Sequence, residues 1–349
     1  MTRVHHDIVV TGLAAISPAG VGLAPLQETL RNGECRLKPM PEEVVGETGH
    51  SWGKVEGFRG ADFMPPLKAR KFDRCSLFAV VAAGMAIQDA GIDLGTLDRT
   101  RIGILLGCGF GGVPNSEEFL RGYFTRGGAG LVPMLFPNTV PNAPASNASI
   151  EYGLKGPNVT HVQRFCSAES AFLMALRFLE EERADILITG GVDEVHPVIL
   201  QGFRDMGQLR RYGASFAEGA GFLVLERRGH AVARGARIRA NVGSVRTIGL
   251  LPQGIEAAGL ERLLGETETP SLVCFSGTAD SLSFLTERFC GVQSLVPGRL
   301  LGRSLAMGGI AMASLVLSLS PGVKGLHLAA SPEGPYYAVD FHGGDPVQS

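Results

Sequence analysis

Residues 152–194 read YGLKGPNVTHVQRFCSAESAFLMALRFLEEERADILITGGVDE, and this stretch decides the fold class. A short strand is expected from Val159, a helix over residues from about 166 to 182, and a buried strand over Asp185–Thr189 that closes at Gly190-Gly191. A helix between two strands, the second of them almost wholly apolar, is typical of an α/β protein with a buried sheet.

The same alternation continues toward both ends of the chain. Helices rich in Ala and Gly indicate close packing between layers, whereas residues 35–66 predict a long surface excursion and residues 136–149 an irregular segment. The remaining expected elements are strands at Ile8–Val10, Arg101–Gly107, Phe222–Glu226 and Ser271–Phe275, and helices over residues 73–90 and 307–319. The fold class expected is therefore α/β with buried, mostly parallel sheets.

Composition and charge exclude several classes of function. The 349 residues are 45% hydrophobic and 19% charged, a balance that indicates a large interior or a large subunit interface. A net charge of −2 and a pI near 6.5 give no support to binding of nucleic acid or a membrane surface. The six cysteines form no CxxC pair, so neither a zinc site nor a disulfide framework is expected. No signal segment opens the chain, and we expect a cytoplasmic location.

Several motifs occur together in one order. They are IVVTGLAAISPAG (8–20), KFDRCSLFAVVAAGMAIQDAGI (71–92), YGLKGPN (152–158), DILITGGVDE (185–194), SFAEGAGFLVLE (215–226) and HAVARGARI (230–238). Together they resemble the condensing enzymes of fatty-acid and polyketide synthesis, the beta-ketoacyl-carrier-protein synthases. The resemblance is good to about residue 240 and weaker beyond. It implies a thiolase-like duplicated fold of five alternating layers (αβαβα), with a ketosynthase-like half at residues 1–235, a shortened half at 236–349, and a dimer.

The resemblance also implies where a catalytic triad should lie. In this family a Cys opens a buried helix, where the helix N-terminus stabilises the thiolate, and two His assist from turns of the second half. The Cys position falls on Phe165, nine residues after Gly156 and 25 before Gly190. Ser276 and Leu305 occupy the two His positions. All three positions of the triad are therefore predicted to be degenerate.

Cys166 is the alternative nucleophile, because it follows Phe165 directly. Adjacent helical residues point about 100° apart, which follows from 3.6 residues per turn. Cys166 is therefore expected to point away from the family's substrate tunnel and to be a buried structural thiol. Ser276 has no His or Lys beside it in the sequence, although folding can bring one close.

One further motif resembles a dinucleotide-binding site but lacks part of its pattern. Gly107, Gly109 and Gly112 match the G-x-G-x-x-G outline of a dinucleotide site after a strand. No acidic residue closes a second strand about 20 residues later, as that fingerprint requires. Tight backbone packing is the expected role of these glycines, and neither a cofactor nor a metal is expected.

Three functions remain open from the sequence. The first is a chain-length-factor-like subunit, without catalytic activity of its own, that pairs with an active ketosynthase and shapes the acyl-chain tunnel. The second is a stand-alone degenerate homodimer that binds an acyl or carrier-protein ligand. The third is an acyltransferase with rewired chemistry at Cys166 or Ser276. Candidate contacts for an acidic acyl carrier protein are Lys68, Arg70, Lys71 and Arg74, with a solvated helix start as the alternative role of this cluster.

Overall fold

The computed structural model describes most of the chain. The described residues are 3–4, 7–209, 215–251, 256–265, 268–277, 287–331 and 334–344. Each candidate site residue named from the sequence lies within these ranges. No helix in the described part is both long enough and apolar enough to cross a membrane.

The first set of strands forms one half of a large mixed sheet. Its order is β7-β6-β8-β10-β2, in which β7, β6 and β8 are parallel and β10 runs antiparallel to both neighbours. These strands are β2 (Ile8–Ser17), β6 (Ile102–Cys108), β7 (Asn158–His161), β8 (Ile186–Asp193) and β10 (Gly219–Arg227).

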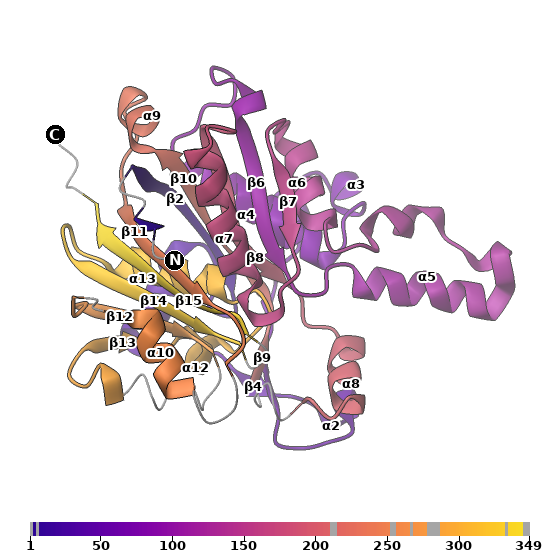
Figure 1. Ribbon diagram of the computed structural model, residues 1–349. Coiled ribbons are helices and arrows are strands. Elements are labelled where there is room, and N and C mark those ends of the chain that lie inside the picture. Colours follow the sequence, from indigo (N-terminus) through magenta and orange to yellow (C-terminus); the bar gives the residue numbers. More distant parts are fainter. Residues whose placement is uncertain are drawn as a thin grey trace.

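The second set repeats this topology. Its order is β13-β12-β14-β15-β11, with β13, β12 and β14 parallel and β15 antiparallel to both neighbours. These strands are β11 (Ala240–Ile248), β12 (Leu272–Ser276), β13 (Gln293–Leu295), β14 (Lys324–Ala330) and β15 (Tyr336–Gly343). The two sets appear in the same chain order and meet where β11 pairs with β2, as Figure 1 shows by the change from indigo to orange. The fold is therefore duplicated.

The remaining strands are short. β1 pairs with β11, β3 pairs with β2, and the other three form a separate small sheet. They are β1 (Arg3–Val4), β3 (Gly20–Val21), β4 (Lys38–Pro39), β5 (Ser51–Gly53) and β9 (Ser215–Ala217). The small sheet lies partly within residues 35–66, for which the sequence predicts a surface excursion.

Helices separate and cover the two sets of strands. α7 (Ser167–Glu180) and α13 (Gly308–Ser318) lie in the central layer, where α13 packs against β8 and β10 of one set and β12 and β14 of the other. α4 (Arg74–Asp89) covers the outer face of the first set, and α10 (Glu256–Leu264) covers the outer face of the second. These five layers are those of the thiolase-like fold.

The other helices lie around this body. They are α1 (Leu23–Asn32), α2 (Glu42–Val45), α3 (Pro66–Ala69), α5 (Val113–Arg126), α6 (Ala143–Tyr152), α8 (Pro197–Asp205), α9 (Arg228–Ala233) and α12 (Pro297–Leu301). Short 3₁₀ turns are η1 (Gly60–Asp62), η2 (Arg99–Arg101), η3 (Gly127–Gly130), η4 (Pro133–Asn138) and η5 (Arg164–Cys166). Figure 1 shows α5 projecting away from the sheets.

One feature of the fold differs from the sequence-based expectation. The sheet is mixed rather than mostly parallel, because β2, β10, β11 and β15 pair in antiparallel fashion. Layers of helix cover both faces of these strands, so that β2 and β8 are buried along their whole length. A strand buried on both faces is apolar throughout whichever way its neighbours run, so an apolar run alone does not distinguish parallel from antiparallel pairing.

Candidate functional site

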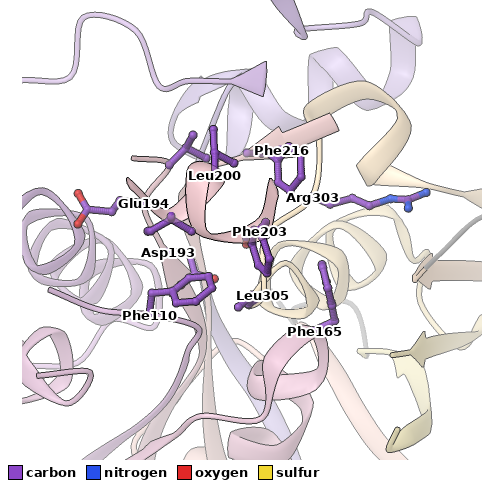
Figure 2. Close-up of a pocket in the computed structure, with 13 residues that line it drawn as sticks. Phe110, Phe165, Asp193, Glu194, Leu200, Phe203, Phe216, Arg303 and Leu305 are labelled. Carbon is purple, nitrogen blue, oxygen red and sulfur yellow. The ribbon is translucent and has the colours of Figure 1, made fainter. Parts of the chain in front are cut away.

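The three positions that the sequence predicts to be degenerate lie around two neighbouring pockets. Phe165 precedes α7, Leu305 precedes α13, and Ser276 ends β12. The first pocket, here called the apolar pocket, has about 340 Å³ of empty space when the part open to solvent is counted. Figure 2 shows Phe165, Leu305 and Phe203 pointing into its middle. The side chains around it are Phe110, Phe165, Asp193, Glu194, Val195, Ile199, Leu200, Phe203, Phe216, Ala217, Arg303, Ser304 and Leu305.

The second pocket, here called the serine pocket, has about 460 Å³ of empty space, counted in the same way, and reaches Ser276. It shares Phe165, Arg303 and Ser304 with the apolar pocket. The aromatic ring of Phe165 is half-buried and belongs to the boundary between the two spaces. The residues around the serine pocket are Phe165, Phe275, Ser276, Gly277, Val296, Gly298, Arg303, Ser304, Met307 and Ala311.

A sharp turn in the backbone places Phe165 at this boundary. β7 ends at His161, and Arg164 then adopts a φ of 51°, which is uncommon for a residue with a side chain. α7 begins immediately afterwards, at Ser167. A Cβ at Gly107 would overlap with the backbone of Ser167, so the glycine at this point of β6 lets the start of α7 approach the sheet. The turn therefore presents residue 165 to the pockets.

Cys166 points elsewhere. Its side chain is fully buried among Ala329, Tyr337 and Leu173, outside both pocket linings. The thiol donates a hydrogen bond to the carbonyl oxygen of Pro335 at 3.2 Å. Burial, together with the nearby Glu169 carboxylate, raises the pKa of this thiol well above its usual value. A thiol in such surroundings has almost no thiolate at neutral pH and is a poor nucleophile.

Folding brings Ser276 to a buried carboxylate. The Ser276 hydroxyl donates a hydrogen bond to Oε1 of Glu169 at 3.1 Å, and Nε2 of His327 lies 2.9 Å from the same oxygen. Glu169 lies in the first turn of α7, and His327 lies on β14, which pairs with β12. Sequence reasoning missed both residues, because the partners are 107 and 158 positions apart and belong to none of the motifs.

Two carboxyl groups line the apolar pocket. Burial raises the pKa of Asp193 to about 7, against the effect of the N–H groups of Gly109, Phe110 and Ala306. Burial also raises the pKa of Glu194 to about 8, and negative charges nearby add to this shift. Glu194 is therefore mostly protonated at neutral pH, whereas Asp193 is about half protonated there and mostly protonated only below neutral pH.

The four residues of the predicted basic cluster differ in their surroundings. Arg70 and Lys71 are exposed, whereas Lys68 pairs with Glu151 at 2.6 Å. Arg74 binds the buried Glu218 at 2.6 Å, donates to the carbonyl oxygen of Val55, and stacks on the rings of Phe58 and Phe78. The Arg74 guanidinium therefore holds the start of α4 against the interior, while its side chain stays one third exposed.

The glycines of the dinucleotide-like outline are packed against protein. A Cβ at Gly109 would meet Leu305, and one at Gly112 would overlap with the carbonyl oxygen of Asn138. These glycines therefore let other parts of the chain pack closely against the turn. Among the described residues, no group of three or more His, Cys, Asp or Glu side chains is arranged to hold a metal ion.

Comparison with known families and curated proteins gives one consistent result. Residues 5–231 match the family described as Beta-ketoacyl synthase, N-terminal domain. The curated relatives include 3-oxoacyl-[acyl-carrier-protein] synthase 2 of Staphylococcus aureus (strain COL), 29% identical over 267 residues, and its namesake in a Synechocystis strain, 29% identical over 249 residues. These alignments cover 70% and 66% of this chain but only 63% and 60% of the relatives, so the chain matches less than two thirds of their length.

Solved structures agree on the fold. The ishigamide ketosynthase/chain length factor has a TM-score of 0.83 at 21% identity, and the likeness covers 97% of this chain and 100% of that one. A chain from a type II PKS acyl-carrier protein in complex with its ketosynthase has a TM-score of 0.80 at 21% identity, covering 96% and 99%. A Beta-ketoacyl synthase from Burkholderia phymatum has a TM-score of 0.80 at 19% identity, covering 97% and 100%.

Proposed function

The chain belongs to the beta-ketoacyl synthase family, and we propose that it is a chain-length-factor-like subunit of that family. In this role it does not condense acyl chains itself. It pairs with an active ketosynthase and forms part of the wall of the tunnel that holds the growing acyl chain. The cytoplasmic location and the division into halves at residues 1–235 and 236–349 belong to the same proposal.

One observation carries this proposal: Phe165 lies in the turn directly before α7, at the position that the family resemblance assigns to the catalytic Cys. A phenyl ring cannot form the acyl-enzyme, and loss of a nucleophile from a catalytic unit costs about a millionfold in rate. The two neighbouring positions, Ser276 and Leu305, offer no imidazole. Cys166 cannot replace Phe165 from its buried place without rebuilding the turn before α7.

An exposed apolar surface supports a protein partner. Residues 113–138, here called the apolar arm, comprise α5, η3 and η4, and α5 buries none of its side chains. Phe124 is 80% exposed and Met134 is 75% exposed. Several large apolar side chains exposed on one projecting segment are typical of an interaction site. The arm contacts α6 and α8, and α6 packs beside β7, which is the last strand at its edge of the sheet. The other exposed apolar residues of the arm are Leu120, Tyr123, Val132 and Phe136.

The experiment is co-expression of the tagged chain with the ketosynthase encoded beside it, if that enzyme carries Cys and two His. We expect a stable heterodimer that elongates an acyl thioester with a malonyl donor, and no elongation by this chain alone. A chain that remains a homodimer in the presence of that ketosynthase contradicts the pairing. Elongation by the purified chain alone contradicts the loss of the condensing activity.

A second function, a homodimer that holds an acyl ligand, is favoured by the apolar pocket. Phe110, Phe203 and Phe216 supply its aromatic wall. Native mass spectrometry of the purified chain distinguishes the two functions. A bound acyl ligand on a homodimer that ignores the ketosynthase favours this second function. For an acyltransferase at Cys166, the thioester of an acyl probe would have to form on that thiol, which the burial of its side chain opposes.

An acyl carrier protein is proposed as a further partner. Arg70 and Lys71 are the exposed members of the predicted cluster, and their charge suits an acidic partner. One similar structure is that of a type II PKS acyl-carrier protein in complex with its ketosynthase. Replacing Arg70 and Lys71 with Glu should weaken binding of the carrier protein without separating the heterodimer.

A further inference from the structure

The base of the serine pocket is a buried polar cluster that condensation does not use. Ser276 is half-buried and lines the pocket, whereas Glu169 is 1% exposed and His327 is fully buried. Oε2 of Glu169 and Nδ1 of His327 have no hydrogen-bond partner among the described residues. A carboxylate and an imidazole are costly to desolvate, so stability alone does not explain their presence beneath a reachable hydroxyl.

The geometry of the cluster suits proton transfer from the serine. A general base must lie within hydrogen-bond reach of the proton that it removes, and the Ser276 hydroxyl is 3.1 Å from Oε1 of Glu169. His327 holds that same oxygen from the other side at 2.9 Å. His327 pairs with Cys274 of β12, the strand that ends at Ser276. The pairing of β12 with β14 therefore sets the positions of both the serine and the imidazole. The carboxylate is therefore positioned by the sheet and not by a surface loop.

The pocket also contains a cation without a carboxylate partner in the described part of the chain. Arg303 lines both pockets, and its side chain lies along α12, where a Cβ at Gly298 would be 3.3 Å from its Cγ. Burial, with the nearby Arg299, lowers the pKa of this guanidinium. A cation held in such a site can stabilise negative charge that develops on a substrate oxygen.

We propose that Ser276 is a nucleophile toward acyl thioesters, with Glu169 as its general base, and that the chain hydrolyses short-chain acyl thioesters bound in the serine pocket. His327 is a positioning residue that holds the Glu169 carboxylate. Arg303 stabilises the oxyanion. The apolar pocket, on the other side of Phe165, offers room for the end of an acyl chain. This inference extends beyond the proposed pairing function and does not depend on it.

The reaction consumes only the acyl thioester and one water molecule. The Ser276 oxygen attacks the thioester carbonyl carbon while its proton passes to Glu169. The C–S bond then breaks, and the protonated Glu169 returns the proton to the leaving thiolate, which leaves an acyl ester on Ser276. Water attacks this ester and gives a proton to Glu169, the ester C–O bond breaks, and the serine oxygen takes that proton back. The products are one carboxylic acid and one thiol.

The test uses the purified full-length chain and the butyryl thioester of N-acetylcysteamine. We expect release of free thiol and a butyryl group on the peptide that contains Ser276, seen by mass spectrometry after acid quench. Ser276→Ala should abolish both. Glu169→Gln, which keeps the shape of the side chain but cannot accept the proton, should slow thiol release at least about 100-fold. Ser318→Ala is the matched control and should leave thiol release unchanged, because Ser318 is exposed at the end of α13 and lines neither pocket.

Two further variants separate chemistry from folding. Ser276→Cys retains a nucleophile, so the label should persist as a thioester that hydroxylamine removes. His327→Gln retains a donor to Glu169, and we expect kcat to fall while KM stays unchanged. Absence of thiol release from the wild-type chain, or a label at Cys166 instead of Ser276, overturns the inference. Pairing is measured separately, by co-purification of Ser276→Ala with the ketosynthase. A chain that pairs but does not hydrolyse thioesters contradicts this inference and not the pairing function.

Discussion

Phe165 determines what both pockets can hold. It is the one side chain of the three degenerate positions that lines both of them, and it packs beside Leu305 in the cluster around the apolar pocket. An uncharged filler at this position closes the place that a thiolate would occupy. If the pockets join when the ring is removed, the space available to an acyl chain becomes longer. The identity of residue 165 then controls chain length as well as the absence of condensation.

Phe165→Ala is therefore expected to lengthen the acyl product of the heterodimer. Because the ring is half-buried, its loss should cost about 2 kcal/mol of unfolding free energy, less than for a fully buried phenylalanine. Product length is measured by mass spectrometry after reaction with malonyl donor. Phe63→Ala, at a 45% exposed phenylalanine remote from both pockets, should leave product length unchanged. Shorter or unchanged products from Phe165→Ala contradict the role of the ring.

Glu194 should make the protein less stable as pH rises. Its pKa is ordinarily 4.5 and is raised to about 8 by burial, with Asp73, Glu218 and Asp193 adding to the shift and Arg74 opposing it. Between these two values the folded chain keeps a proton that the unfolded chain has released. The free energy of unfolding therefore falls as pH rises through this window, and the stabilisation is fully present only below the lower value.

The measurement is urea unfolding at about pH 5 and about pH 8. Glu194→Gln cannot titrate, so the difference in unfolding free energy between the two pH values should shrink relative to the wild type. Glu43→Gln, at an exposed position on α2, should leave that difference as it is. If the difference in unfolding free energy between the two pH values is the same in Glu194→Gln as in the wild type, the Glu194 carboxyl group does not cause the pH dependence.

At the scale of elements, Gly309 lets α13 pack closely against the first set of strands. A Cβ at Gly309 would overlap with the carbonyl oxygen of Gly221 on β10 and with the backbone of Gly191 on β8. Both obstacles are backbone atoms, so the helix would have to move. Because α13 also packs on β12 and β14, such a movement would disturb both sets of strands.

Gly309→Ala should therefore destabilise the fold by about 3 kcal/mol, although Ala favours the helix more than Gly does. A Cβ added at Gly202, in α8, would have no atom within 4 Å, so Gly202→Ala should stabilise by up to about 1 kcal/mol. Thermal unfolding of the two variants should thus show shifts of opposite sign. Equal shifts would mean that helix propensity, and not the approach of α13 to the sheet, sets the cost.

Sequence reasoning predicted elements better than contacts. The apolar runs and helical spacing predicted β6, β8, β12, α4, α7 and α13 close to their observed bounds, because each pattern is local. The Gly-Pro-Asn and Gly-Gly motifs, at fixed spacing, placed Phe165 at the start of α7. The Glu169–His327 pair has no such signal, because it depends on the register of β14 beside β12 and on the central layer. Local patterns carry no information about which distant strands pair.

At the scale of the whole molecule, the two ends of the large sheet differ in what lies near them. β7 ends the first set of strands and β13 ends the second, and in the described part of the chain the exposed apolar arm lies on the side of β7. Figure 1 shows the arm, built on α5, reaching out beyond the sheet. A second subunit of the same fold could cover this arm and continue the sheet past β7. The exposed apolar side chains of the arm, rather than charged ones, are therefore expected to stabilise the proposed heterodimer.

Phe124→Glu together with Met134→Glu should abolish pairing with the ketosynthase. A charge buried at an interface without a partner costs far more than the contact that it replaces, and both side chains are exposed in the isolated chain, so folding should be unaffected. Val232→Glu is the matched control, because Val232 is 62% exposed on α9, outside the apolar arm. Pairing is measured by co-purification and size-exclusion chromatography, and folding by thermal unfolding of each variant alone. Heterodimers that survive both charges on the arm would place the partner on another face of the chain.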